Sequence, residues 1–481
     1  MDDNERESGA TLNSPSTHDR QSAHLPNAFQ FLPESTPRIE TRFRRIVTDL
    51  PVPEDADRLR CAVHVFPQVN CYQAPVIWDR AEDFQVFDRH GNCWIDFSST
   101  AVMTNTGHGH PQIREAVARH AQQGLLAQFS FASDVRIELA ERLAELAPDH
   151  CDKVYFWTVG SEAIECALRL ARTWGQMQHP EKYHILTHRG DYHGWTLGAH
   201  QVSGQQASKP WLTTADPAIH HLPFPSSASR TDWDAHLDQQ WQALADRGVD
   251  SERVAGVFIE TLQGWGALRL PDAYVQSLRR WADQHGVLLI FDEVQTGFGR
   301  TGRWFAHEHY DTRADLICIG KGVTSSLPLA AVLGPAKILD TLGPGEITTT
   351  HAAHPLSCAA ALANLDVLQR EGLVDAARQK QAVVTAELQR LQRQFPRHIS
   401  DTRGLGLLHA IHVIDPKTGA PSQRLAADWT WAAVKRGVMV FHTNQPSLKV
   451  CPPLTISEEA IVEGIGALGE ALERLVSSHP D

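Results

Sequence analysis

The 481-residue sequence lacks any apolar stretch that approaches the roughly 20 residues a membrane-spanning helix requires. It also lacks a block of Lys or Arg, because its 44 basic residues are scattered among 57 acidic ones, for a formal net charge of −13. This balance is not typical of a protein that follows a nucleic-acid backbone or docks on an anionic membrane. We therefore expect neither nucleic acid nor membrane among its partners.

The eight cysteines are scattered, and no CxxC pair occurs. Zinc sites and disulfide scaffolds usually show regular Cys spacing, so we expect reduced thiols and no metal centre, with zinc or disulfides as the lesser alternative. The first residues, MDDNERESGATLNSPSTHDRQ, lack the apolar core of a secretory signal. These absences predict a cytoplasmic protein.

The length of the chain predicts more than one domain. Residues 1–45 are rich in polar residues and Pro, and we expect an arm that is disordered or draped over a partner. We assign residues 46–110 to the N-terminal part of a small domain and residues 111–345 to a large domain. Residues 346–481 are assigned to the C-terminal part of the small domain, with an α+β pattern of long helices, two strands and a last helix from Ser457.

Short apolar runs alternate with helical patterns through the middle of the chain. The runs are KVYFW, YHILTH, VAGVFIE, VLLIF, LICIG and LAAVLG, starting at residues 153, 183, 254, 287, 316 and 329. The helical patterns include DVRIELAERLAELAPD, with Asp134 as its expected N-cap, and SEAIECALRLARTWG, with Gly175 as its expected end. Almost continuously apolar strands separated by helices predict an α/β fold with a mostly parallel sheet covered by helices.

Unusual residues follow four of these strands, at the edge where α/β sheets bind ligands. After KVYFW, the segment TVGSEAIE opens a helix whose free N–H groups suit an anion such as phosphate, with the Ser161 hydroxyl beside them. A plain Ser cap is the alternative. After YHILTH, the segment RGDYHGWT brings the aromatic Tyr192 to the rim, where simple packing is the alternative.

The other two strand ends carry an acid and a base. Asp292 follows VLLIF, and a buried carboxylate there needs a protonated nitrogen, either of a heterocycle or of Arg300 or Arg303. Lys321 follows LICIG, where burial would lower the pKa of the amine as a nucleophile requires; a surface lysine is the alternative. A lysine for a Schiff base, a carboxylate for a pyridinium, a helix N-terminus and an aromatic ring together meet the needs of pyridoxal 5′-phosphate (PLP).

Longer motifs surround these residues. They are TGHGHP, GSEAIECALRLAR, YHGWTLGA, DEVQTGFGRTG, GKG, THAAHPLSCAAALA and RGLGLL, in this order. From FQVFDRHGNCWIDFSS to its C-terminus, the chain resembles the class III (ω-) aminotransferases of PLP fold type I. The resemblance implies a large domain with a mostly parallel sheet, a smaller α+β domain, and a homodimer with shared active sites. It implies transfer of an amino group from an ω-amine or amino acid to a keto acid, with pyruvate as the expected acceptor.

The resemblance also implies roles for individual residues around the cofactor ring. Lys321 would bind the cofactor as a Schiff base and shuttle a proton during catalysis, and Asp292 would bind the pyridine nitrogen. Gln295 would approach the phenolic oxygen. Val294 and Tyr192 would pack on opposite faces of the ring.

The same resemblance extends to the phosphate. Gly160, Ser161 and Glu162 would hold the phosphate within one subunit, and Thr350 would reach the phosphate of the neighbouring subunit. Glu260 corresponds to an acidic position near the site.

Two positions depart from the family pattern. Many members carry EPxQGEGG, whose second Glu pairs with an Arg just before PPL, and this pair lets one site accept both an ω-amine and an α-keto acid. Here the two positions are Trp265 and Lys449, and a Lys offers a point charge instead of a bidentate fork. We expect both residues, with Glu260, to contact the substrate, and we do not expect a glutamate/2-oxoglutarate cycle.

These departures leave other reactions open. A Lys at this position also occurs in relatives that are lyases, so elimination of phosphate or ammonia from an amino-phosphate or amino-phosphonate is the alternative function. A decarboxylase is a lesser one. A non-catalytic member is disfavoured because both Lys321 and Asp292 are present, and a Rossmann dehydrogenase because no GxGxxG follows the first core strand.

Overall fold

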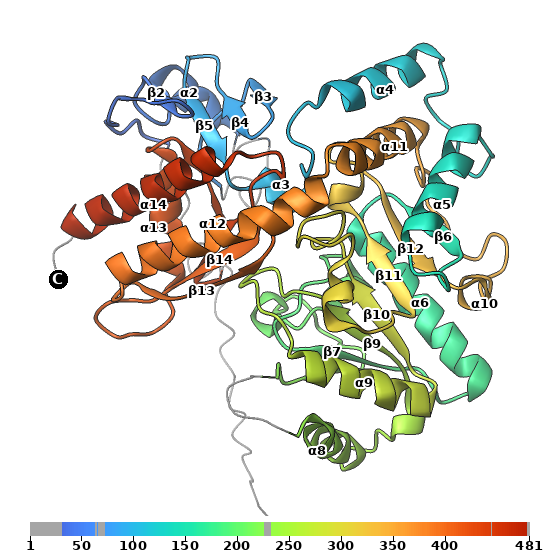
Figure 1. Cartoon of the computed structure of the whole chain (residues 1–481). Coiled ribbons are helices and arrows are strands. Elements are labelled where there is room, and N and C mark those ends of the chain that lie inside the picture. Colours follow the sequence, from blue (N-terminus) through green and yellow to red (C-terminus); the bar gives the residue numbers. More distant parts are fainter. Residues whose placement is uncertain (1–30, 63–64, 66–72, 226–231, 444, 479–481) are drawn as a thin grey trace, which may run out of the picture. The chain divides into compact units, whose positions relative to one another are not determined.

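The computed structural model describes residues 31–62, 65, 73–225, 232–443 and 445–478. Within the described residues, one compact unit comprises residues 31–35, 49–62, 65 and 73–76 and contains helix α2 (Pro53–Ala62). The other unit, residues 36–48 and 77–481, contains all the sheets (Figure 1). In the predicted N-terminal arm, residues 1–30 lie outside the described part, whereas β1 (Ile39–Glu40) and β2 (Arg45–Ile46) pair as a short hairpin. None of the helices in the described ranges is long and apolar enough to cross a membrane.

The central sheet has seven strands in the order β6-β12-β11-β10-β9-β7-β8. Their bounds are β6 (Lys153–Trp157), β7 (His184–His188), β8 (Ile219–Leu222), β9 (Val254–Glu260), β10 (Leu288–Asp292), β11 (Leu316–Ile319) and β12 (Ala330–Gly334). Strands β7 to β11 pair in parallel, and only β12 pairs antiparallel with its two neighbours, β11 and β6. The predicted α/β fold with a mostly parallel sheet is confirmed, and all six apolar runs are strands.

Helices follow most strands of this sheet and continue through the C-terminal region. Their bounds are α4 (Pro111–Gln122), α5 (Asp134–Leu146), α6 (Gly160–Gln178), α7 (Leu197–Val202), α8 (Trp233–Ala245), α9 (Asp272–His285), α10 (Ala336–Leu339), α11 (Pro355–Arg370), α12 (Leu373–Gln394), α13 (Gln423–Val434) and α14 (Glu458–Ser478). Two helix-end predictions are wrong. Asp134 is the first helical residue, and Ser133 takes the N-cap position. Gly175 does not end α6: a Cβ there would lie 2.2 Å from the Lys182 carbonyl oxygen, so close packing is what this glycine permits.

Both faces of the central sheet are covered, because successive residues of a strand point to opposite sides. In β10, Phe291 packs in the same apolar cluster as Leu278 of α9, whereas Ile290 packs in the cluster that contains Ile164 of α6. Figure 1 shows α6 and α9 on either side of the strands. The sheet is therefore buried on both faces, as its continuously apolar strands predict.

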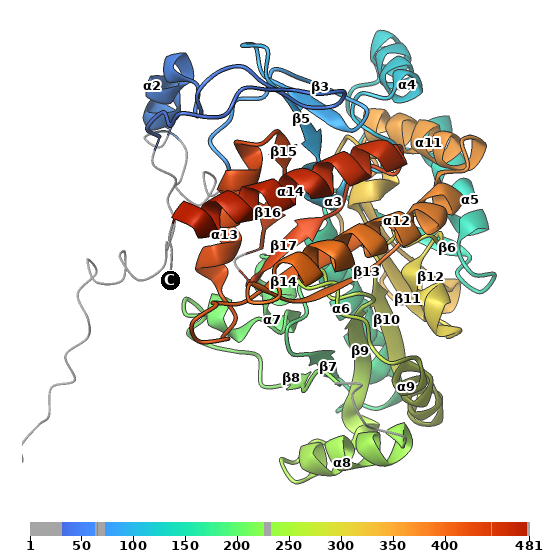
Figure 2. The ribbon, with the colours of Figure 1, turned by 60° about the vertical axis from the view of Figure 1, so that its left-hand side comes forward.

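Two further sheets complete this unit. The first, in the order β1-β2-β5-β4-β3, contains β3 (Arg80–Glu82), β4 (Gln85–Phe87) and β5 (Cys93–Asp96), and β15 (Val438–Met439) pairs with β5. The second, β13-β14-β17-β16, is antiparallel and contains β13 (Ile399–Leu405), β14 (Leu408–Val413), β16 (Phe441–His442) and β17 (Ser447–Val450). Helices α12 and α14 lie side by side next to it (Figure 2). The domain boundaries drawn at residues 110 and 345 stay predictions.

Candidate active site

The carboxyl ends of five strands meet at one edge of the central sheet. β7, β9, β10 and β11 are parallel, and β6 runs in the same direction because β12 is antiparallel to both β11 and β6. A cavity of about 400 Å³ opens at this edge. Eight of the predicted site residues line it: Gly160, Ser161, Tyr192, Glu260, Asp292, Val294, Gln295 and Lys321. The tertiary structure therefore brings together side chains that the sequence spreads over 160 positions of the chain.

Asp292 is the last residue of β10 and is only 5% exposed. Its Oδ2 lies 2.8 Å from Nδ1 of His193, and its Oδ1 accepts a hydrogen bond from the Val294 N–H at 2.9 Å. The alternative pairing with Arg300 is wrong, because the Arg300 guanidinium donates to Asn105 Oδ1 at 2.7 Å and to backbone carbonyls. A carboxylate held in this way at the cavity wall can receive a protonated ring nitrogen.

Lys321 follows β11 and opens the short 3₁₀ turn η5 (Lys321–Val323). Its φ of 42° is in the left-handed region, which is strained for a residue with a Cβ and which turns the chain away from the strand. The side chain lines the cavity, so the alternative of a surface lysine is wrong. Burial lowers the pKa of the Lys321 amine, and the charges of Asp292 and Glu260 oppose this shift without cancelling it. The amine is thus nearer to its neutral, nucleophilic form than a free lysine is.

The first turn of α6 faces the same cavity. Among the described residues, no hydrogen bond satisfies the backbone N–H of Gly160 or Ser161, as expected at a helix N-terminus. A Cβ on Gly160 would lie 2.8 Å from Val294 Cγ1, and a Cβ on Gly194 would lie 2.1 Å from Ser161 Oγ. The two glycines leave room around free N–H donors, which suits a phosphate group. The Glu162 carboxylate instead accepts from the N–H of Thr158 and caps its own helix.

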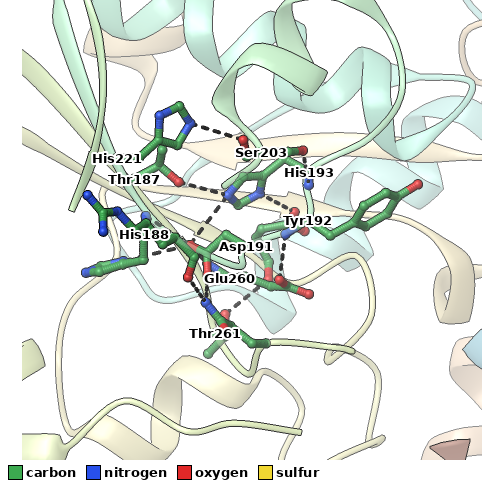
Figure 3. Close-up of polar contacts among 12 residues, drawn as sticks. Thr187, His188, Asp191, Tyr192, His193, Ser203, His221, Glu260 and Thr261 are labelled. Atoms are coloured by element: carbon green, nitrogen blue, oxygen red, sulfur yellow. Dashed lines mark hydrogen bonds and ion pairs between the residues drawn. The ribbon is translucent and has the colours of Figure 1, made fainter. Parts of the chain in front are cut away.

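Glu260, the last residue of β9, joins two parts of the cavity wall. Its Oε2 accepts from the Tyr192 N–H at 2.8 Å (Figure 3), and its Oε1 accepts from the Gly264 N–H at 2.7 Å and from Gln295 Nε2 at 3.2 Å. Burial, together with the charge of Asp191, raises the pKa of Glu260 to about 8. Glu260 therefore positions the backbone that carries Tyr192.

The other predicted residues lie outside the cavity lining. Thr350 is exposed in the turn before α11. Lys449 of β17 is 1% exposed, and its ammonium donates to the Gly264 carbonyl. Trp265 donates from Nε1 to Gln263 Oε1 at 3.2 Å and packs edge-on against His412. The substrate contacts of Lys449 and Trp265, and the role of Thr350 across a dimer, stay predictions.

Several residues of the site had no signal in the sequence analysis, among them His193 and Met103. His193 stands next to Tyr192 in the quoted segment RGDYHGWT, but its contact with Asp292 spans 99 positions. Met103 lines the cavity directly after α3 (Ser99–Val102), a left-handed turn in which all four residues have positive φ. Four consecutive left-handed residues without Gly are rare, and no sequence rule predicts them.

This set of groups fits PLP. An amine of lowered pKa, a carboxylate at the wall and a helix N-terminus cleared by glycines correspond to its aldehyde, its ring nitrogen and its phosphate.

Comparisons with known proteins agree. The Aminotransferase class-III family matches residues 68–472. A probable 4-aminobutyrate aminotransferase of Bacillus subtilis (strain 168) is 32% identical over 406 residues, covering 82% of this chain and 92% of that protein. A leucine/methionine racemase of Thermococcus litoralis is 30% identical over 420 residues, covering 85% and 93%. The solved structure of a PLP-bound amine transaminase from an uncultivated Pseudomonas species has a TM-score of 0.77 and 26% identity, covering 91% of this chain and 100% of that chain.

The match extends over most of the chain, and it agrees with the fold type I architecture and the PLP chemistry of the cavity. The protein therefore belongs to the class-III aminotransferase family and is a PLP-dependent enzyme.

Proposed function

We propose that the protein is an aminotransferase that moves an amino group from an ω-amine or amino acid to a keto acid, with pyruvate as the acceptor. The observation that carries the proposal is that Lys321 and Asp292 line the same cavity as the first turn of α6. The relatives named above, a probable 4-aminobutyrate aminotransferase and an amine transaminase, support an amine donor.

When bound, PLP supplies an electrophilic aldehyde and a protonated ring that draws electrons from the substrate carbon. Lys321 would hold the cofactor through its amine, and the same amine would move the proton of the substrate carbon. The lowered pKa of Lys321 favours both tasks. Asp292 keeps the ring nitrogen protonated, and its buried bond to His193 fixes its orientation.

The remaining cavity residues orient the cofactor. Val294 and Tyr192 would pack against the ring, and Gln295 would bond its phenolic oxygen. Gly160 and Ser161 would bind the phosphate through their backbone N–H groups, and Glu162 stabilises this turn through its cap on the Thr158 N–H. The space between Gly160 and Val294 has no room for a Cβ, which supports a tight fit of ring and phosphate.

We further propose a homodimer with shared active sites, in which Thr350 reaches the phosphate of the other subunit. An exposed apolar segment supports it: Leu126 is 53% exposed and Phe131 is 76% exposed. The same segment contacts the loop of Thr350, because His354 Nε2 lies 2.7 Å from the Leu126 carbonyl oxygen. Arg136 of α5 bridges the two by donating to the carbonyls of Phe131 and Ala352. A subunit interface would bury these side chains.

The substrate proposal follows from the two family departures. Many family members carry a glutamate at the position of Trp265, so Lys449 has no acid there to pair with. Its ammonium donates to the Gly264 carbonyl instead. This supports an anion-binding role without the Glu–Arg switch, and therefore pyruvate over 2-oxoglutarate. Elimination finds no support among the relatives named above, and it is not part of the proposal.

We also propose a cytoplasmic location. The described cysteines are free thiols, and all of them except Cys61 are buried. Unpaired thiols are typical of a reducing compartment.

A single-turnover absorbance experiment tests the function. PLP-loaded enzyme is mixed with ω-amines and amino acids without a keto acid, and ammonia and the enantiomer ratio are measured in parallel. A transaminase converts the cofactor band to its amino form once, releases no ammonia, and regains the band when pyruvate is added. Sustained ammonia release, or racemisation of the donor with an unchanged cofactor band, would overturn the proposal. Racemisation is measured because one of the relatives named above is a racemase.

A further inference from the structure

Asp191 is a second buried carboxylate behind the cavity, and the proposed function gives it no role. It is 1% exposed, and its Oδ1 accepts from Gln263 Nε2 at 2.5 Å. Its Oδ2 lies 3.7 Å from His188 Nδ1 and 3.7 Å from His193 Nε2. Figure 3 shows His193 beside Asp191 at the centre of this network. Because Nδ1 of His193 meets Asp292 at 2.8 Å, the imidazole lies between two carboxylates.

This arrangement restricts the protonation of His193. A neutral imidazole carries one proton, so either Nδ1 or Nε2 would present a lone pair to a carboxylate. With the proton on Nδ1, the lone pair of Nε2 would face Asp191; with the proton on Nε2, the lone pair of Nδ1 would face Asp292. Only the doubly protonated ring presents an N–H to both carboxylates, with a hydrogen bond to Asp292 at 2.8 Å and an ion pair with Asp191 at 3.7 Å. Its Nε2–H can also reach the Thr187 hydroxyl oxygen at 3.4 Å.

We propose that Asp191 is a positioning residue that keeps His193 doubly protonated, so that His193 holds Asp292 through a charge-assisted hydrogen bond. Such a bond is shorter and stronger than a neutral one, so it fixes the Asp292 carboxylate in place to receive a protonated ring nitrogen. An imidazolium alone would neutralise Asp292. The second carboxylate restores a net charge of −1 to the Asp191–His193–Asp292 trio, and this is the charge that a cationic ring requires.

The surroundings of the trio support this assignment. Burial alone would lower the pKa of His193, but the contacts with Asp191 and Asp292 outweigh it and raise the pKa to about 10. Burial would likewise raise the pKa of Asp191, yet His188 and His193 hold it well below its ordinary value. The Phe258 ring of β9 packs edge-on against His193, and Glu260 is an acid beside Asp191. Asp292 is the member of the trio that acts on the Lys321 amine.

The inference rests on the proposed role of Asp292 for its consequence, but the protonation of His193 can be measured without cofactor. The protein is labelled with ¹⁵N-histidine, and the His193 signals are assigned by comparison with His193→Gln. In the cofactor-free wild type, we expect both ring nitrogens to carry protons from pH 7 to about pH 9. In Asp191→Asn, which keeps the shape of the side chain, we expect His193 to lose one proton within this range.

Two control variants separate charge from packing. His188→Gln removes the other histidine beside Asp191 and leaves both carboxylates, so His193 should stay doubly protonated. Asp315→Asn removes a buried carboxylate that pairs with Arg279 at 2.6 Å outside the cavity, and it should also leave the His193 signals unchanged. In PLP-loaded enzyme, Asp191→Asn should add an ionisation below about pH 9 to the profile of kcat and to the visible absorbance band.

A neutral His193 in the wild type at pH 7 would overturn the proposal, and this measurement holds even when Asp191→Asn fails to fold. An Asp191→Asn protein in which His193 titrates as in the wild type would overturn it as well. The proposed role of Asp292 can fail independently of this inference. It fails if Asp292→Asn enzyme turns over normally although His193 is doubly protonated in the wild type.

Discussion

The carboxylate of Glu260 accepts a hydrogen bond from the backbone N–H of Tyr192 at 2.8 Å, although 68 positions separate the two residues. This bond links the loop after β7 to the end of β9. It therefore fixes the position of the Tyr192 backbone at the cavity wall. Because burial raises the pKa of Glu260 to about 8, the bond also couples the site to pH.

Glu260→Gln should change how stability depends on pH. The pKa of Glu260 is higher in the folded protein than its ordinary value of 4.5, so the folded state retains a proton that the unfolded chain releases. Its contribution to stability is therefore complete below about pH 4.5 and is lost as the pH rises through about 8. The Tm of the variant relative to wild type should rise across this window in cofactor-free protein. Exposed Glu473→Gln is the control, and equal slopes for both variants would contradict the assignment.

Lys321→Ala should abolish turnover and the absorbance band of covalently bound PLP, because Lys321 is the only lysine among the described residues that line the cavity. Lys153→Ala, which removes a surface lysine paired with Asp340, should leave both unchanged. Spectra of the two purified variants with added PLP decide the matter. Wild-type turnover in Lys321→Ala would remove Lys321 from the reaction.

Asp292→Asn should retain part of its PLP but lose activity by roughly a hundredfold, the order of effect found when one electrostatic stabiliser is removed from a site. The amide has the shape of the carboxylate but cannot keep a ring nitrogen protonated. The loss should therefore appear in kcat at saturating donor. Near-normal kcat would refute the role of Asp292.

Gly194→Ala should weaken PLP binding, because its Cβ would lie 2.1 Å from Ser161 Oγ in the expected phosphate cradle. Its φ of +132° also strains any L-residue. Gly248→Ala is the matched control, since Gly248 has a φ of +81° but open space around it. Both variants should lose about 1 kcal/mol or more of stability from the backbone. Only Gly194→Ala should release PLP during dialysis.

Lys449→Ala should raise the KM for donors that carry a carboxylate or another anionic group, and leave the KM of neutral amines unchanged. The reason is that the Lys449 ammonium is buried and, among the described residues, hydrogen-bonded only to the Gly264 carbonyl, so an incoming anion would form its first direct ion pair there. Steady-state kinetics with a matched pair of donors, one charged and one neutral, measures this. Equal KM changes for the two donors would exclude Lys449 from substrate binding.

The strands of the central sheet could be predicted because each is a short, almost continuously apolar run that a parallel sheet buries on both faces. Parallel strands also place their carboxyl ends at one edge, so the residues directly after those runs were expected to meet there. Lys321 and Asp292 were found in this way, each from the few residues around it. The roles of glycines were harder to predict from the sequence. Gly175 was predicted to end a helix, but it lies inside α6 and permits close packing there.

The tertiary structure alone decided which side chains pair. The sequence offered Arg300 as a partner for Asp292, because the two are near neighbours in the chain, yet strand order places His193 there and directs Arg300 to backbone carbonyls. Likewise, nothing in the local pattern around Asp191 indicates that it lies 3.7 Å from two histidines. Local sequence determines backbone preference and burial, whereas contacts over about a hundred positions depend on the order in which strands pair. The sequence by itself therefore determined the sheet and the edge at which the cavity lies, and the fold decided the charge network behind it.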